Sequence, residues 1–350
     1  MNTLIANQDA DQIVRFIERK LEDDVMAVSA LVNNLKQSNI KPNTLGDICR
    51  RLLPNFAKYR GVLDAAEADL REIYSECLQA QGLYAEAADQ LAQADAFASS
   101  CPRLLQIADL YLEAGDSVSA ETFIHKAGYK LPSEAANPVV KLRYTLAYAR
   151  VLDSKLRPLE ALHKYLEVLR NPDLSLDDKA AITQKAVVCA ATTGNHRLTP
   201  SLRSALKHEL ANIARGLQLF ANKIVHGEYI DDISEVSALL EAHHLATTAN
   251  GKTVFTNALI EHNVRAIAHA SETVSIDELA AKLNLPETEV FETVMKMASD
   301  KKIAALIDQE NGTVHFPAPE VSENERIRAF CERVEAAEKK AALLLRAQNI

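Results

Sequence analysis

Residues 254–316 switch between helical and strand periodicity in an order that constrains the fold more than any other part of the chain. Apolar residues near one face predict a helix over 254–269, and a β-prone pair follows at 273–274. The capping box Ser275–Glu278, in which each side chain accepts the other's free backbone N–H, predicts the start of a second helix. A third helix is expected to begin at Pro286, since proline costs nothing in a first helical turn.

Two apolar runs complete this region, at 303–308 and 313–316, with Asn311-Gly312 between them. An Asn-Gly pair between apolar runs is a strong short-range signal for a β-hairpin. The order of helix, strand, helix, helix and two-stranded wing is that of a winged-helix domain, a fold that either reads DNA or joins proteins. A wing leaves a strand edge on which another chain can pair, so we expect main-chain contacts with a partner there. The residues expected at this edge are Ile303, Ala305, Ile307, Asp308, Val314 and Phe316.

The charges of this region argue against DNA. The third helix would be the recognition helix, yet its first turns carry Glu287, Glu289 and Glu292 against a single Lys296. DNA presents a dense line of negative charge, and its readers place basic or amide side chains on this helix. The whole chain has a formal net charge of −9 and a pI near 5.6, the wrong sign for a phosphate-binding surface. We therefore expect the module to bind protein and no nucleic acid.

Upstream, the chain reads as helical hairpins in series. Gly82 and Gly115 lie 33 residues apart, and each ends one amphipathic segment and precedes another. A third hairpin is predicted from 139–152 and 158–170, and a fourth unit over 176–194. A period in the thirties, with small alanines at the crossing points, is typical of stacked helix pairs. These features favour an α-solenoid of tetratricopeptide-like hairpins over a single four-helix bundle.

The last segment predicts a lone helix. Pro317 and Pro319 end the wing, and Ser322–Glu325 forms another capping box. Apolar residues then recur at alternating spacings of three and four, a narrow stripe typical of a helix that packs against other helices. Two interpretations remain open: the helix enters a bundle with the tails of other subunits, or it folds back on its own domain. The stripe consists of Ile327, Phe330, Val334, Ala337, Ala341 and Leu344.

Together these patterns predict a mostly α fold with four parts. N-terminal helices are expected over residues 1–60, and a solenoid of tetratricopeptide-like repeats over 61–242. A winged helix with a small β-wing is expected over 243–318, and a C-terminal bundle helix over 319–350. At 350 residues, 48% of them hydrophobic and 25% charged, the chain is long enough for two domains of ordinary globular composition.

Composition also limits where the protein works. No run approaches the ~20 apolar residues of a membrane span. The N-terminus lacks the basic start and apolar core of a signal peptide, so we expect no membrane association. The five cysteines are scattered and none forms a CxxC pair, which indicates buried thiols in a reducing compartment, cytosol or nucleus. They are Cys49, Cys77, Cys101, Cys189 and Cys331.

Motifs that carry catalysis are missing from the sequence. It contains no glycine-rich phosphate loop, no GxSxG nucleophile elbow, no HExxH and no His-x-His plus Asp set of a zinc isopeptidase. The adjacent His243-His244 is the one tempting metal pair, but consecutive helical residues point apart and no third ligand follows at i+4. We therefore expect a surface loop pair there, and ordinary core or surface groups at His226 and His262. The prediction is a non-enzyme with no cofactor and no metal site.

Several strings in the sequence resemble those of PCI-domain subunits, in order and at similar spacing. This family builds the COP9 signalosome, the proteasome lid and an initiation-factor core, and the likeness is greatest to its signalosome members. It covers residues 60–316 and is most specific in the winged-helix half. The strings are ADLYLE at 108–113, YARVLD at 148–153, ATTANG at 246–251, ALIEHN at 258–263, IDQ at 307–309 and VHF at 314–316.

The resemblance implies a non-catalytic scaffold subunit of the signalosome, which removes NEDD8 from cullin-RING ubiquitin ligases through a zinc-dependent isopeptidase in another subunit. Its implied partners are the other PCI and MPN subunits and the cullin-RING ligase, in cytoplasm and nucleus. A role in sensing the ligase would require an insertion loop, for which Gly227–Asp232 is the candidate and a plain turn the alternative. A PCI subunit of the lid or of an initiation-factor complex, a DNA-binding winged-helix regulator and a cryptic hydrolase remain open alternatives.

Overall fold

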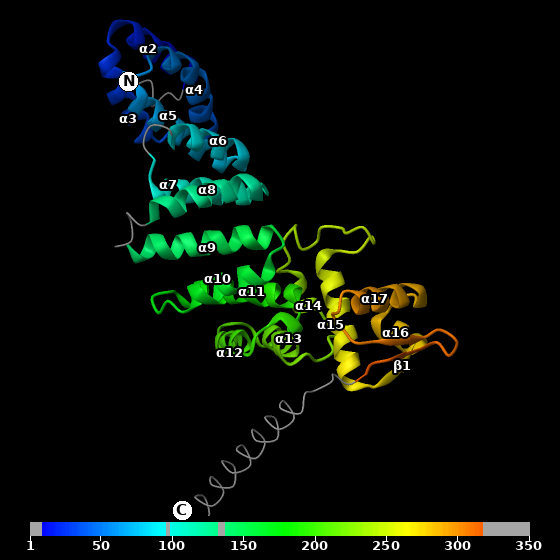
Figure 1. Cartoon of the computed structure of the whole chain (residues 1–350). Coiled ribbons are helices and arrows are strands. Elements are labelled where there is room, and N and C mark those ends of the chain that lie inside the picture. Colours follow the sequence, from blue (N-terminus) through cyan, green and yellow to red (C-terminus); the bar gives the residue numbers. More distant parts are fainter. Residues whose placement is uncertain (1–8, 96–98, 132–136, 318–350) are drawn as a thin grey trace, which may run out of the picture. The chain divides into compact units, whose positions relative to one another are not determined.

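The computed structural model describes residues 9–95, 99–131 and 137–317 (Figure 1). Contacts divide the described residues into two compact units: those up to residue 226 with 230–259 form the first, and 227–229 with 260–317 the second. The predicted C-terminal helix and its apolar stripe lie outside the described residues. None of the described helices combines the length and apolar character that a membrane crossing needs.

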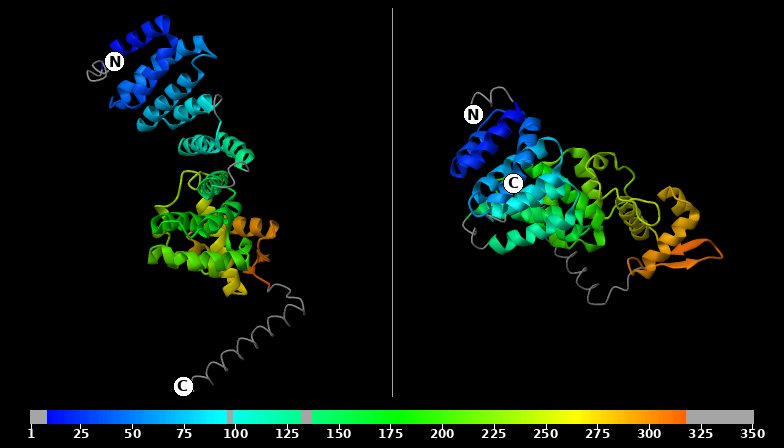
Figure 2. Two further views of the ribbon diagram at one scale, coloured as in Figure 1. Left: turned by 90° about the vertical axis from the view of Figure 1, so that its left-hand side faces the viewer. Right: turned by 90° about the horizontal axis from the view of Figure 1, so that it is seen from above.

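The first unit consists of helices that stack along the chain (Figures 1 and 2). From α4 to α11 each helix packs against the next, and α2 with α4, α3 with α5 and α7 with α9 also contact. This pattern confirms the predicted solenoid of hairpins. The helices are α2 (Ala10–Asp23), α3 (Val25–Lys36), α4 (Pro42–Phe56), α5 (Asp64–Ala80), α6 (Tyr84–Asp95), α7 (Cys101–Glu113), α8 (Ser117–Lys130), α9 (Pro138–Ser154), α10 (Pro158–Leu169), α11 (Leu176–Thr193), α12 (Pro200–Glu209), α13 (Arg215–His226) and α14 (Ser234–Ser237), with 3-10 turns at Ala57–Tyr59, Asn195–Arg197 and Leu210–Asn212.

Three hairpin turns of the solenoid share one helix cap, in which a backbone N–H donates to the carbonyl five residues earlier. The pairs are Leu83 to Leu78 at 3.0 Å, Asp116 to Tyr111 at 2.8 Å and Arg157 to Leu152 at 2.9 Å. This Schellman bond requires a left-handed residue just before the donor, a conformation that glycine adopts without strain. Gly82 and Gly115 supply it at φ 77° and 81°, as their spacing predicted, but the third turn places Leu156 there at φ 56°.

Buried apolar side chains form three successive clusters in the first unit. The first joins α2 to α5 around Phe56, and the second joins α5 to α9. The third joins α9 to α14 and the start of α15 (Val254–Ala270), and it contains the fully buried Tyr165 and Phe255. The turn that precedes α15 lies against this third cluster and carries the histidine pair described below.

The second unit is a winged helix, which confirms the predicted order of elements. Beyond the part of α15 from residue 260, it contains β1 (Thr273–Ser275), α16 (Ile276–Leu283), α17 (Glu287–Ser299), β2 (Leu306–Asp308) and β3 (Thr313–His315). The sheet order is β1-β3-β2, and both neighbours run antiparallel to β3. Val314 pairs with Val274 on one side and Ile307 on the other, and its buried side chain lies in a core with Val264, Leu279, Val290 and Val294.

Local capping differs from the sequence prediction in two details. The Glu278 N–H donates to Ser275 Oγ at 3.1 Å, but the Glu278 carboxylate accepts from Lys282 at 2.7 Å rather than closing the capping box. Pro286 lies one position before α17, where its extended backbone (ψ 143°) makes it the N-cap. Both details leave the helix start where the pattern placed it, within the usual variation of helix ends.

Candidate functional site

The wing provides the first candidate site, and the structure moves its free edge to β2. β3 pairs on both sides, so the predicted exposed edge at Thr313–Phe316 is wrong: Val314 is the centre of the sheet and Phe316 is buried. Ile303 and Ala305 precede β2 and pack partly buried on the core of the unit, which removes them from the strand edge as well. The interior of the wing uses these four apolar residues because a three-stranded sheet must cover α15 to α17 with one face.

β2 keeps the properties of a docking edge. It has one strand neighbour, β3, so its other side presents backbone groups that another strand could pair. Leu306 is 65% exposed at its start, Ile307 is half-buried, and Asp308 is exposed. The Asp308 carboxylate accepts the N–H groups of Glu310 and Asn311, which fixes the turn that leads into β3. Of the predicted edge residues, Ile307 and Asp308 therefore remain candidates for partner contact, and Leu306 joins them.

The surface of α17 is acidic at its N-terminal end. Glu287 and Glu292 are exposed, and Lys296 follows one turn later. Met295 adds an apolar side chain that is 50% exposed. A recognition helix for DNA needs cationic or amide donors in these positions, so the surface suits a protein partner better than a phosphate backbone.

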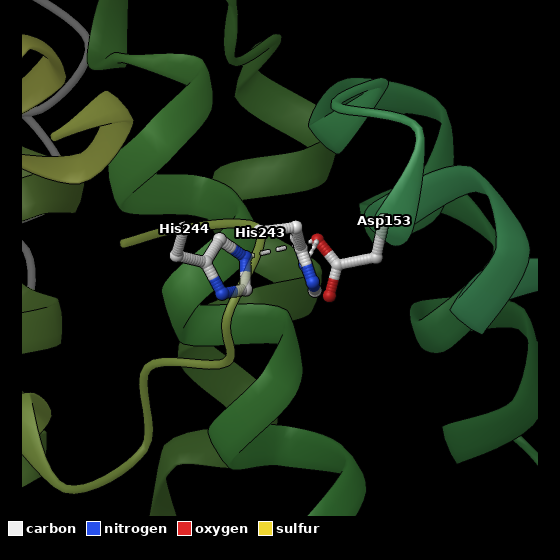
Figure 3. A group of neighbouring side chains, drawn as sticks. All are labelled: Asp153, His243 and His244. Carbon is white, nitrogen blue, oxygen red and sulfur yellow. Dashed lines mark hydrogen bonds and ion pairs between the residues drawn. The ribbon is translucent and has the colours of Figure 1, made fainter. Parts of the chain in front are cut away.

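The second candidate site is the pair His243 and His244, and the expectation of a surface loop is wrong here. The two side chains are 16% and 3% exposed, and both imidazoles face the carboxylate of Asp153, in the last turn of α9 (Figure 3). His244 Nε2 lies 3.2 Å from Asp153 Oδ1, and His243 Nε2 lies 3.6 Å from the same oxygen. The residues sit on a turn rather than a helix, so their rings come together, with centroids 3.9 Å apart.

Hydrogen bonds define the tautomer of His244. The backbone N–H of Glu241 donates to His244 Nδ1 at 3.2 Å, so Nδ1 carries a lone pair and the proton lies on Nε2. His244 therefore donates from Nε2 to Asp153. The thiol of Cys189, in α11, lies 3.3 Å from the same carboxylate oxygen and donates to it as well.

The charges of the cluster shift the ionisation of its members. Burial alone would raise the pKa of Asp153, but the imidazoles of His243 and His244, which both face its carboxylate, outweigh burial and hold the pKa well below its usual range. Burial, reinforced by the negative charge of Asp153, raises the pKa of the Cys189 thiol well above its ordinary value. Asp153 is thus an anion and Cys189 a neutral thiol at neutral pH. His243 also lies between two carboxylates, because its Nδ1 is 3.8 Å from Glu241, which pairs with Lys185.

Sequence reasoning missed Asp153, although one signal was available. A carboxylate in the last turn of a helix opposes the helix dipole and is unfavourable without a cation or donors nearby. Asp153 follows the apolar pair Val151-Leu152 in that position. The residue 91 positions away that satisfies it could not be identified from spacing, because no local pattern links the two.

Gly227–Asp232, the candidate insertion loop, is a short connection engaged by its own chain. Gly227–Tyr229 belongs to the winged-helix unit. The buried His262 donates from Nε2 to the Glu228 carbonyl at 2.8 Å, and the Tyr229 hydroxyl donates to the carbonyl of Lys282. These contacts favour the plain-turn alternative. They also confirm that His262 is a satisfied core group, and His226 is exposed.

Two family models match the chain. One is described as "PCI domain" and matches residues 235–318, and the other as "PSMD12/CSN4, N-terminal" and matches residues 62–177. The first spans the winged helix with the turn before it, and the second spans the hairpins from α5 to α10. The PCI model thus matches the part of the chain that holds the winged helix, and the second model matches helical repeats that precede it.

The curated relatives narrow the family further. The chain is 27% identical over 340 residues to COP9 signalosome complex subunit 4 of Arabidopsis thaliana, which covers 90% of this chain and 85% of the relative. It is 25% identical over 352 residues to the protein of that name in Emericella nidulans, covering 92% and 84%. The match to the Drosophila melanogaster protein of the same name is 29% over 240 residues, covering 66% and 57%. This chain is similar to COP9 signalosome complex subunit 4 over most of its length.

Proposed function

We propose that this chain is subunit 4 of a COP9 signalosome and acts there as a non-catalytic scaffold. In this proposal the assembled complex removes NEDD8 from cullin-RING ubiquitin ligases, and the isopeptidase chemistry belongs to another subunit. The observation that carries the proposal is the similarity to subunit 4 proteins, which extends over about nine-tenths of this chain in two of the relatives. The partners are the other PCI and MPN subunits and the cullin-RING ligase, in cytoplasm and nucleus.

The wing supports this function because it offers a mode of assembly. The free side of β2 can accept a strand from a neighbouring subunit, and Leu306 supplies an exposed apolar anchor beside it. The C-terminal stripe from Ile327 to Leu344 is proposed as a second assembly element that enters a bundle of subunit tails. Replacing Phe330 and Val334 by Asp tests it, since two charges in such a seam should remove the chain from the complex without lowering the stability of the isolated chain.

Affinity purification of the tagged full chain followed by mass spectrometry tests the assignment. We expect the remaining signalosome subunits in near-equal amounts, and recovery of lid or initiation-factor subunits instead would overturn it. The non-enzyme assignment is tested separately with the purified chain and NEDD8-modified cullin, with and without added zinc. We expect no cleavage by the chain alone, while an intact signalosome preparation serves as the positive control.

A DNA-binding regulator is the alternative from a different class, and the acidic surface of α17 speaks against it. A gel-shift titration over a range of salt concentrations tests this directly, because phosphate contacts give a steep salt dependence. We expect no retarded band at low salt, and a band whose affinity falls steeply with salt would favour the alternative.

A further inference from the structure

We propose that Asp153, His243 and His244 form a binding site for one zinc ion in the helical-repeat unit. The site is independent of the proposed assembly function and of any catalytic metal in another subunit. These residues are the one group of three or more metal-ligating side chains, with ligand atoms within 4.8 Å of one another, in the part of the chain that the structure describes. Two imidazoles and a carboxylate are a donor set that zinc prefers.

The spacing of the donor atoms fits a tetrahedral ion. Zinc bonds of about 2.0–2.2 Å to nitrogen and oxygen place neighbouring ligand atoms of a tetrahedron roughly 3.3 Å apart. Asp153 Oδ1 lies 3.2 Å from Nε2 of His244 and 3.6 Å from Nε2 of His243. Both nitrogens face the carboxylate from one side, so small side-chain rotations suffice to converge them on one ion (Figure 3).

One buried nitrogen of the cluster has no hydrogen-bond partner. His243 Nε2 is inaccessible to solvent and forms no hydrogen bond, although it points toward the most buried carboxylate of the cluster. A buried polar atom without a partner is unfavourable, and a cation placed between it and Asp153 would satisfy both groups. His243 is 16% exposed through its other atoms, and a water molecule would take the fourth position of a tetrahedral ion.

The surroundings of the carboxylate resemble those of metal sites in other proteins. The Cys189 thiol donates to Asp153 Oδ1 and orients it from outside the ligand set. Asp153 is already an anion, so zinc need not displace a proton from it. The three ligands come from α9 and from the turn before α15, so zinc would tie α9 to the segment that leads into the winged helix.

His244 requires one rearrangement, which gives the proposal a specific signature. In the structure its proton lies on Nε2 because Nδ1 accepts the N–H of Glu241. A neutral imidazole that binds zinc through Nε2 carries its proton on Nδ1 instead, so the ring shifts its proton and the Glu241 N–H must turn away. Zinc binding should therefore expose the Glu241 amide. The Phe255 amide, which donates to the His244 carbonyl at 3.1 Å, should keep its bond.

The first test titrates the chelator-treated full chain with metal. Calorimetry measures the binding of zinc, and the visible absorption of a tetrahedral ion measures the binding of cobalt. We expect one equivalent per chain. His243→Ala and Asp153→Asn should each weaken binding by more than ~100-fold, beyond the 10–100-fold that loss of an outer-shell partner costs. The exposed His208 provides the matched control, and His208→Ala should bind as the parent does.

The outcomes separate the proposed site from adventitious binding. Circular dichroism confirms that each variant folds. If His243→Ala does not fold, Asp153→Asn still tests the site, because it keeps the size and one acceptor oxygen of the native residue. No binding by the parent chain, or binding that both folded variants retain, would overturn the proposal. Amide exchange measured by NMR gives the second readout: zinc should speed exchange at Glu241 and leave Phe255 unchanged, and unchanged exchange at Glu241 would count against His244 as a ligand.

Discussion

His244 donates from Nε2 to Oδ1 of Asp153 across 3.2 Å, although 91 residues separate the two along the chain. The contact fastens the turn that carries Glu241 and the histidine pair to the last turn of α9. It also provides donors for a carboxylate that the helix dipole disfavours in that position. The position of the segment before α15 therefore depends on one buried anion in a distant repeat.

Replacing Asp153 by Ala should release this segment. The change leaves the Nε2–H of His244 buried without an acceptor, and a lost hydrogen bond to a charged group costs about 1.5–3 kcal/mol. We expect a comparable fall in the free energy of unfolding and faster hydrogen exchange over residues 241–255, measured by mass spectrometry. Asp153→Asn should cost less because it keeps an acceptor, and Asp173→Asn, at an exposed position, should change neither quantity.

The lowered pKa of Asp153 also predicts how stability depends on acid. A carboxyl group whose pKa is lower in the folded state stabilises the fold at pH values above its unfolded pKa of about 3.9, and this contribution is lost as the pH falls toward the folded value. The difference in stability between parent and Asp153→Asn should therefore begin to shrink below about pH 4 and keep shrinking as the pH falls further. Curves that run parallel from pH 7 to pH 3 would contradict the assignment of a native anion at this position.

Leu156 predicts a stabilising substitution. Its left-handed backbone costs an L-residue about 1–2 kcal/mol, while its side chain is 44% exposed and contributes little to the core. Leu156→Gly should therefore raise the free energy of unfolding by about 0.5–1 kcal/mol after the greater entropy of unfolded glycine is subtracted. The reverse change, Gly82→Leu, should destabilise by a similar amount, because a side chain there meets no neighbour and only the backbone is strained. A loss of stability in Leu156→Gly would show that its side-chain contacts outweigh the strain.

His262 predicts a pH dependence in the winged-helix unit. Burial lowers the pKa of His262, and its neutral ring donates to the Glu228 carbonyl. Since the folded state disfavours the charged form, the stability of this unit should fall as the pH drops below the unfolded pKa of about 6.5. Thermal unfolding between pH 8 and pH 5 measures this fall. His262→Gln keeps a donor but does not titrate, so its pH profile should be flatter; an equally steep profile would assign the effect to other groups.

Leu306→Lys tests the free edge of β2. The side chain is 65% exposed, so a lysine should leave the melting temperature of the isolated chain within about 1 °C, as surface changes usually do. A charge on the edge should nevertheless discourage strand pairing and reduce recovery of partner subunits in affinity purification. Leu219→Lys, at a leucine of α13 that is 60% exposed, is the matched control and should reduce recovery less. Equal recovery with both variants would exclude the β2 edge as a docking site.

The wing shows how far sequence reasoning reaches. The Asn311-Gly312 turn and the apolar alternation predicted both strands of the hairpin, because their signals are local. The third strand, Thr273–Ser275, was predicted as a strand, but its pairing with β3 was not. That pairing joins residues about forty positions apart and gives β3 a strand neighbour on each side. The expected edge is therefore the centre of the sheet. Residue alternation identifies the faces of a strand, but it does not identify the neighbours.

The prediction for His243 and His244 was wrong for a related reason. The prediction was a surface loop pair, and its argument against a metal site used helix geometry, in which adjacent side chains diverge. The chain instead forms a turn at Ala242–His244 that brings the rings together. Asp153 completes the cluster from α9, and no sequence period connects it to His243. Leu156 was missed because glycine and asparagine are the residues that mark a left-handed position in sequence, and a leucine held there by the surrounding hairpin leaves no signal.

Gly227–Tyr229 carries a consequence for any attempt to divide this protein. These three residues belong to the winged-helix unit, residues 230–259 belong to the first unit, and the described residues from 260 onward belong to the winged-helix unit again. A gene cut anywhere between the two visits, including at the sequence-predicted boundary of residue 243, would assign Tyr229 to one product and its acceptor Lys282 to the other. A separately expressed fragment that keeps the whole winged-helix unit must therefore begin at or before residue 227, and so it must include residues 230–259 of the first unit.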